Sequence, residues 1–219
     1  MSSPIFSQPQ ASKDNPGGGK LDLTKIKLLV DKGWYRLYED EGRDLWFLEV
    51  YGGLRKTFRT PKGCWFKPLP GKLGLKLVEY IAASLRPQSR LLPLVLENRT
   101  LTKLASYLYR YKSGSQSSLR KYIQVIDYFL RWSRRKADSL VEACFTDEGL
   151  PNQRAVMELA QTIDQYLGEL QAEGLSTQTI ASTKAVLKTW LEVNGVTLPK
   201  IFTPMIRHSY SPRAPTPDA

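Results

Sequence analysis

The sequence is poor in the residues that form disulfides and bind transition metals. It has two cysteines, Cys64 and Cys144, which lie far apart with no metal-ligand spacing around them, and its one histidine is His208. This scarcity argues against a disulfide framework and against a zinc or other transition-metal catalytic site. We therefore expect no cofactor and a reducing, cytoplasmic environment.

Long apolar runs are also lacking. The longest, Leu91–Leu96, contains a proline and is far too short to cross a bilayer. Residues 1–20 are rich in Ser, Pro, Gln and Gly and lack the basic-then-apolar order of a signal peptide, so they are expected to form a disordered lead-in. We expect no membrane partner.

Acidic residues are few beside the basic ones. The chain has 32 Lys plus Arg against 21 Asp plus Glu, a net charge of +11. Such an excess favours a polyanionic partner, with nucleic acid first and an anionic membrane surface second. A soluble protein that is basic for no functional reason is the alternative.

The N-terminal third predicts a small α+β domain over residues 21–90. Residues 21–30 fit a short helix or a strand equally well. An antiparallel β-meander is predicted over residues 33–67, because short aromatic and branched runs alternate there with Gly or acidic turn chemistry. The runs are 33–40, 45–51 and 54–60, with Gly52-Gly53 as a hairpin signal and "PKG" (61–63) as a further turn.

A helix over residues 73–85 is predicted to cover this sheet. Leu75, Leu77, Val78 and Ile81 make its apolar stripe. Pro87 and Pro93 then indicate a linker, so a domain boundary is expected near residues 87–98.

The region over residues 98–200 predicts four amphipathic helices with short connections, typical of a compact bundle. Ser176 is predicted to cap the last helix, with Leu175 and Ile180 as a hydrophobic staple. The fold class is therefore mainly α, a four-helix bundle preceded by a small α+β domain. The predicted stripes are Leu101, Leu104, Leu108 and Tyr111; Leu119, Ile123, Ile126, Phe129 and Leu130; Val156, Leu159, Ile163, Leu167 and Leu170; and Ile180, Leu187, Trp190 and Leu191.

Basic residues concentrate on this helical region. Between Lys103 and Lys136 there are nine Lys or Arg and one acid, Asp127. The second and fourth helices both open with hydroxyl and amide side chains, "GSQSS" and "STQT", and a helix N-terminus offers N–H groups to phosphate oxygens. Ser, Thr and Gln beside Lys and Arg can contact phosphates and base edges.

We expect the two starts to face outward together and bind DNA; capping and solubility alone are the alternative. The candidate DNA-binding residues are Ser115, Gln116, Ser118, Arg120, Lys121, Gln124, Arg131, Thr177, Gln178, Ser182, Lys184 and Lys188.

The order of these motifs resembles the core-binding (SAM-like) domain of tyrosine recombinases, the phage-integrase-like family. Ser115 to Tyr122 is similar to that family's Ser-x-x-Thr-x-x-x-Tyr motif, with Ser118 where Thr is commoner, and Leu175 to Ile180 is similar to its Leu-Ser-x-x-Thr-Ile motif. The resemblance covers residues 98–200. It implies that two of the helices lie against double-stranded DNA at the core recombination site.

The resemblance also implies that residues 201–219 are a linker into a catalytic domain, since "PRAPTPDA" looks like that linker and the next helix start. The family's catalytic arginines, lysine and tyrosine nucleophile match nothing here. Arg207, His208 and Tyr210 lie too close together in sequence to surround one phosphate, although Arg207 and Arg213 are candidates for DNA contact. This chain is therefore expected to be inactive alone and to use no small-molecule substrate. The full-length protein is expected to act in DNA integration or recombination and to form a homo-oligomer on DNA.

Three alternatives remain open. The meander resembles in outline the arm-binding domain of some integrases, but its acids, Glu39, Asp40, Glu41 and Asp44, would repel DNA, so a protein-contact or structural role competes. For the whole chain, the alternatives to part of a recombinase are a free-standing DNA-binding regulator and a helical protein-interaction scaffold. The basic residues of the arm-binding alternative are Arg55, Lys56, Arg59, Lys62 and Lys67.

Overall fold

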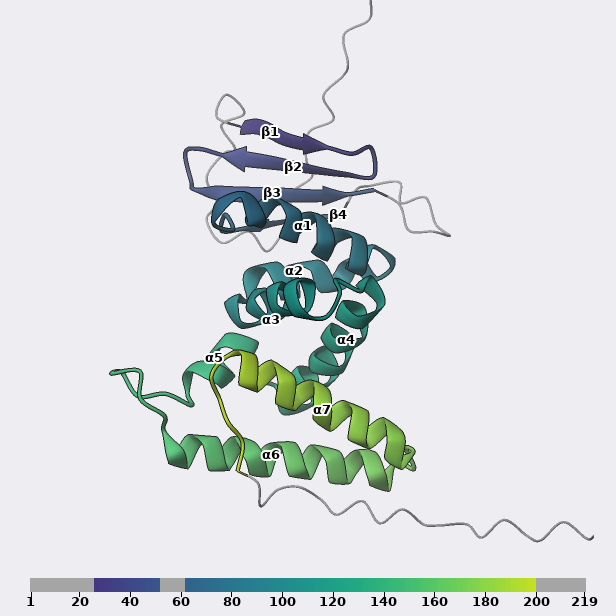
Figure 1. The fold of residues 1–219 in the computed structure, drawn as a ribbon, viewed down its shortest axis with the longest axis vertical. Coiled ribbons are helices and arrows are strands. Elements are labelled where there is room, and N and C mark those ends of the chain that lie inside the picture. The colour runs from purple at the N-terminus through teal and green to yellow at the C-terminus, as the bar shows by residue number, and fades with distance from the viewer. Residues whose placement is uncertain (1–25, 52–61, 200–219) are drawn as a thin grey trace, which may run out of the picture.

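The computed structural model describes residues 26–51 and 62–199. Within these ranges the protein is mainly helical, with one four-stranded antiparallel sheet N-terminal to the helices (Figure 1). The strands are β1 (Ile26–Asp31), β2 (Tyr35–Asp40), β3 (Leu45–Val50) and β4 (Lys62–Phe66). The helices are α1 (Gly71–Leu85), the 3-10 helix η2 (Arg86–Leu91), α2 (Leu92–Glu97), α3 (Arg99–Tyr111), α4 (Gln116–Ser133), α5 (Ala137–Glu142), α6 (Gln153–Ala172) and α7 (Thr177–Val193).

The sheet confirms two of the predicted antiparallel strands, β2 and β3, and adds β1 and β4. Its order is β1-β2-β3-β4, so the described part of the ambiguous stretch, residues 26–30, belongs to a strand. Lys62 and Gly63, predicted as part of a turn, belong to β4 instead and pair with Val50 and Glu49. The predicted run 54–60 and the Gly52-Gly53 hairpin lie outside the described residues.

One face of the sheet is buried because apolar residues line up across the strands. Leu37 pairs with Leu48, which pairs in turn with Cys64, and all three are buried. The turn between β2 and β3 uses acidic chemistry as predicted, since the side chain of Asp40 accepts a hydrogen bond from the Gly42 N–H at 3.0 Å.

Helix α1 covers this sheet with part of its predicted stripe. Leu77, Val78 and Ile81 are buried, but Leu75 is 38% exposed, so its assignment to the stripe was wrong. The buried positions continue toward the end of the helix to Leu85, and Leu75 lies at the solvent edge of the stripe.

The stretch predicted to be a linker is helical and packed. Residues 86–97 form η2 and α2, and α2 contacts β4, α1 and α3. Pro93 is tolerated because it lies in the first turn of α2, where its missing N–H is not needed. Its apolar run is buried, with Leu91, Leu92 and Val95 inside, and one cluster of buried side chains runs from the sheet to α7.

The helical region bears out most of the predicted stripes. Leu108, Ile123, Leu167 and Trp190 are among the predicted side chains that are buried. Tyr111 was assigned to a stripe wrongly, because it is 63% exposed. Helix α7 contacts α3, α4 and α6, and Figure 1 shows α6 and α7 as one layer at the end of the molecule opposite the sheet.

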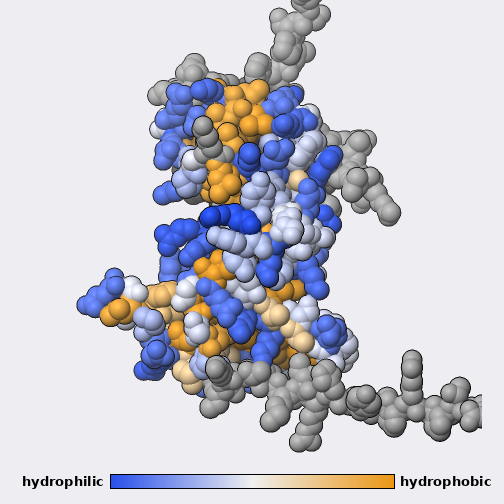
Figure 2. All heavy atoms as spheres, in the orientation of Figure 1, coloured by the Kyte–Doolittle hydropathy of each residue, from blue (hydrophilic) through white to orange (hydrophobic). Residues whose placement is uncertain are grey.

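The surface differs along the long axis of the molecule. In the view of Figure 2, apolar surface shows at the sheet end and again over the helices at the other end, and hydrophilic side chains cross the middle of the same face. None of the helices among the described residues has the length and apolar character needed to span a membrane.

Candidate nucleic-acid interface

The start of α4 is docked on α1. Ser115 caps the helix as its side chain accepts a hydrogen bond from the Ser118 N–H at 3.4 Å. The Tyr80 hydroxyl of α1 donates to the Ser115 carbonyl oxygen at 3.0 Å. Burial raises the pKa of Tyr80 to about 12, so this hydroxyl keeps its proton at neutral pH. One side of this helix start is therefore occupied by protein.

Arg120, predicted to face outward, turns toward α1. Its Nε donates to the Ser84 carbonyl oxygen at 2.9 Å, and the side chain is half-buried. The prediction missed this because α1 lies more than thirty residues earlier in the chain and supplies a carbonyl, which no sequence pattern marks. Arg120 therefore joins α4 to α1.

Arg131 is also engaged within the protein. Its guanidinium donates to the Asp127 carboxylate at 2.9 Å, and Arg90 of η2 lies 3.3 Å from the same oxygen. Asp127 is 8% exposed, so the two guanidiniums serve to neutralise a buried charge. Arg131 also lies over the Tyr128 ring, 4.9 Å from its centroid. The side chains of Arg90 and Arg131 remain about half exposed to solvent.

The other candidates on α4 vary in exposure. Gln116 and Lys121 are exposed, whereas Ser118 and Gln124 are half-buried. Lys121 thus extends into solvent one residue after Arg120.

The start of α7 lies open to solvent. Ser176 caps it as predicted, accepting from the Thr179 N–H at 3.2 Å, and Thr177 and Gln178 are exposed. Ile180 is buried and Leu175 half-buried, consistent with the predicted staple. This start keeps the accessible backbone N–H groups and polar side chains that an anion could approach.

Lys184 and Lys188 follow on the same side of α7, with Ser182 half-buried on another. Partial burial lowers the pKa of Lys184, while Asp164 of α6 raises it and Lys188 lowers it further. Lys188 pairs with Glu192 at 3.6 Å, with both side chains about half exposed. Lys184 is therefore half-buried beside α6, whereas Lys188 is exposed and contacts Glu192, a residue of the groove described below.

The two helix starts do not lie together. Figure 1 shows α4 beginning beside α1 and α7 beginning beside the end of α6, at different levels of the long axis. The last turns of α7 lie instead near the first turns of α4, since Thr189, Val193 and Tyr122 line one groove. The expectation that both starts face outward as a pair was wrong, because α4 begins against α1 whereas α7 begins beside the end of α6.

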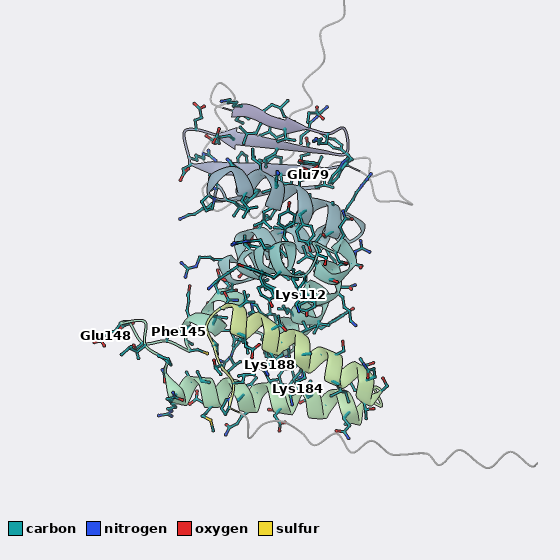
Figure 3. The ribbon with its side chains drawn as sticks, in the orientation of Figure 1. Glu79, Lys112, Phe145, Glu148, Lys184 and Lys188 are labelled. Carbon is teal, nitrogen blue, oxygen red and sulfur yellow. The ribbon has the colours of Figure 1, made fainter. Side chains whose placement is uncertain are left out.

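That groove is the feature that the sequence reasoning missed. It has a volume of about 590 Å³ and brings together the outer face of α3, the turn after it, one residue of α4 and the end of α7. Figure 3 labels Lys112 at this level, with Lys188 and Lys184 below it along α7. We call it the α3–α4–α7 groove; its lining residues are Lys103, Ser106, Tyr107, Arg110, Tyr111, Lys112, Tyr122, Thr189, Glu192 and Val193.

The charge of the groove is positive. Lys103, Arg110 and Lys112 are exposed, and Glu192 is the single carboxylate among the lining residues. That carboxylate is already paired with Lys188. The groove therefore offers three cationic groups to an anionic ligand.

Three tyrosines interleave with these cations. The Tyr107 and Tyr111 rings lie with centroids 5.5 Å apart, and the Arg110 guanidinium lies 5.2 Å from the Tyr111 centroid. Tyr122 is half-buried in the same groove. Cations beside accessible aromatic rings are a pattern typical of nucleic-acid-binding surfaces.

A sequence signal for part of this groove existed. Lys103, Tyr107 and Arg110 recur at four- and three-residue spacing on the face of α3 opposite Leu104 and Leu108. Glu192 could not be found in this way, because only the packing of α7 on α3 brings it there.

The remaining candidates contribute little to this site. Lys67 is exposed after β4, whereas Arg55, Lys56 and Arg59 lie outside the described residues, as do Arg207, His208, Tyr210 and Arg213. Over residues 26–51 and 62–199, no three His, Cys, Asp or Glu side chains gather where they could hold a metal ion.

Comparisons with protein-family models, with curated proteins and with solved structures find no match to this chain.

Proposed function

We propose that the helical region binds double-stranded DNA as the DNA-targeting part of a site-specific tyrosine recombinase. The contact surface is the α3–α4–α7 groove together with the exposed side of α7. One observation carries the proposal: three cations converge on a groove whose single carboxylate is already paired. A net charge of +11 adds long-range attraction to a polyanion.

The open start of α7 complements this surface. Thr177 and Gln178 lie exposed at a helix N-terminus, where partial positive charge and hydroxyl groups suit phosphate oxygens. Lys184 and Lys188 extend the positive side toward the groove, since Lys188 contacts the Glu192 that lines it. DNA lying along α7 would meet phosphate contacts from both places.

The recombinase part of the proposal rests on the two motifs from Ser115 to Tyr122 and from Leu175 to Ile180. Both serines cap their helices, and the apolar stripes that follow them are buried. These features agree with a core-binding bundle built from α3, α4, α6 and α7. A free-standing regulator and a protein-interaction scaffold are the competing functions.

The test is a titration of the protein against duplex DNA at several salt concentrations. Each phosphate contact is expected to contribute a slope of about −0.9 to log K against log salt. The variant carrying Lys103→Ala, Arg110→Ala and Lys112→Ala should flatten this slope by up to about 2.7, because three contacts are removed.

Arg154→Ala is the matched control. Arg154 is a highly exposed arginine at the start of α6, paired with Glu158 at 3.0 Å, and it does not line the groove. Its loss should leave the slope nearly unchanged. If the protein does not bind duplex DNA at low salt, the proposal is refuted and the scaffold function is favoured. If the triple variant and the control change the salt slope equally, the groove is not the contact surface.

A further inference from the structure

The α3–α4–α7 groove exposes more aromatic surface than packing requires. Tyr111 is 63% exposed, yet it lies beside the half-buried Tyr107 and under Arg110 rather than folding into the core. The ring therefore stays exposed with one guanidinium 5.2 Å from its centroid, a combination that nucleic-acid-binding surfaces use for base stacking. The arrangement provides a ring face that a ligand can reach.

The shape of the groove selects what can reach that ring. A continuous duplex presents a convex, stacked surface whose base faces are covered by neighbouring base pairs. A concave groove of about 590 Å³ lies within the range of about 300–1,000 Å³ that accommodates small ligands, so a nucleotide projecting from a strand fits it. Base faces become available only when a base is unpaired and unstacked.

We propose that the groove binds an unpaired nucleotide of a DNA strand, with the base stacked on Tyr111 and its flanking phosphates beside Lys112 and Lys103. Arg110 supports the stack from the other face of the ring. Thr189, half-buried on the α7 wall, supplies a hydroxyl within the groove. The inference rests on the proposed function, because it names which form of DNA this surface prefers.

The experiment compares three probes of one sequence: a continuous duplex, the same duplex with an unpaired tract at its centre, and the single strand. Base stacking on an aromatic side chain contributes about 1–3 kcal/mol per base, so the interrupted duplex should bind about 5- to 150-fold more tightly than the continuous one. A fluorescent adenine analogue in the unpaired tract should be quenched when the protein binds, because it stacks.

Variants of the ring identify the contact. Tyr111→Ala should abolish both the preference for the interrupted duplex and the quenching, because the ring that stacks on the base is removed. Tyr111→Phe keeps the ring and should retain both. Tyr128→Ala is the matched control, since Tyr128 is 54% exposed on α4, pairs with Arg131 and does not line the groove.

The outcomes separate the two proposals. Equal affinity for the continuous and interrupted duplexes overturns the inference and leaves the duplex-binding proposal standing. Equal fold losses on both probes in Tyr111→Ala also overturn the inference, because the ring then gives no preference for the unpaired form. Binding of the interrupted duplex and the single strand alone, with Tyr111-dependent quenching, supports the inference and refutes the duplex function. Unchanged quenching in Tyr111→Ala places the base elsewhere and overturns the inference.

Discussion

The first turns of α4 and α7 contain nearly the same residue types, but the two helix starts have different surroundings in the folded protein. Each begins with a serine cap followed by hydroxyl and amide side chains and then by basic residues. The start of α4 is held by Tyr80 and by the contact of Arg120 with Ser84. The start of α7 has exposed polar side chains and follows a short turn after α6.

The difference shows that a cap motif predicts where a helix begins but does not predict which other elements pack against that helix start. Ser115 and Ser176 both accept a backbone N–H three residues on, which is a local event. Whether Arg120 or Lys184 then reaches a ligand depends on which helix packs beside it. A basic side chain in the first turns of the helix is thus a structural donor in α4, whereas in α7 no such contact fixes it on another helix.

The largest effect is expected from Trp190, which holds α7 to the rest of the molecule. Its side chain is 0% exposed, so Trp190→Ala should lower the free energy of unfolding by about 3–5 kcal/mol. Urea unfolding followed by circular dichroism measures this loss. Trp190→Phe should cost less, because the indole N–H has no hydrogen-bond partner among the described residues. An Ala variant as stable as the parent would show that α7 is anchored by other contacts.

A smaller effect is expected at the docked start of α4. Arg120→Ala removes a hydrogen bond from a charged donor to the Ser84 carbonyl, so the free energy of unfolding should fall by about 1–3 kcal/mol. Affinity for duplex DNA should stay the same once the variant is folded. The neighbouring Lys121→Ala, which removes an exposed cation, should leave stability unaffected. A loss of DNA affinity in Arg120→Ala without a loss of stability would contradict the docking.

The smallest effect is expected at the open side of α7. Lys184→Ala should change the free energy of unfolding by less than about 0.5 kcal/mol, as for most surface substitutions. It should flatten the salt dependence of duplex binding by about 0.9, the contribution of one phosphate contact. Thermal melting and anisotropy titrations measure the two quantities. Destabilisation without any change in slope would mean that Lys184 serves packing against α6 and that the two starts differ less than we infer.

Sequence reasoning succeeded where neighbours in the chain decide the outcome. The buried stripe of Ile180, Leu187 and Trp190 follows from helical spacing, and the turn at Asp40 follows from its own side chain. It failed for Tyr111 and Leu75, which keep the spacing of a stripe but stay exposed because none of the described helices or strands covers them. The spacing of apolar residues shows which face of a helix can be buried, but burial also requires another element to pack against that face.

The amino-acid sequence alone determined the helical character, the strands near the N-terminus, the serine caps and the excess of positive charge, because each depends on local spacing or on composition. Tertiary structure decided which cations remain accessible. It turned Arg120 onto α1, paired Arg131 with a buried carboxylate, and brought Glu192 of α7 to the tyrosines and Lys103 of α3. These contacts join residues that are distant in the chain, and only the packing of whole helices sets the distances between them.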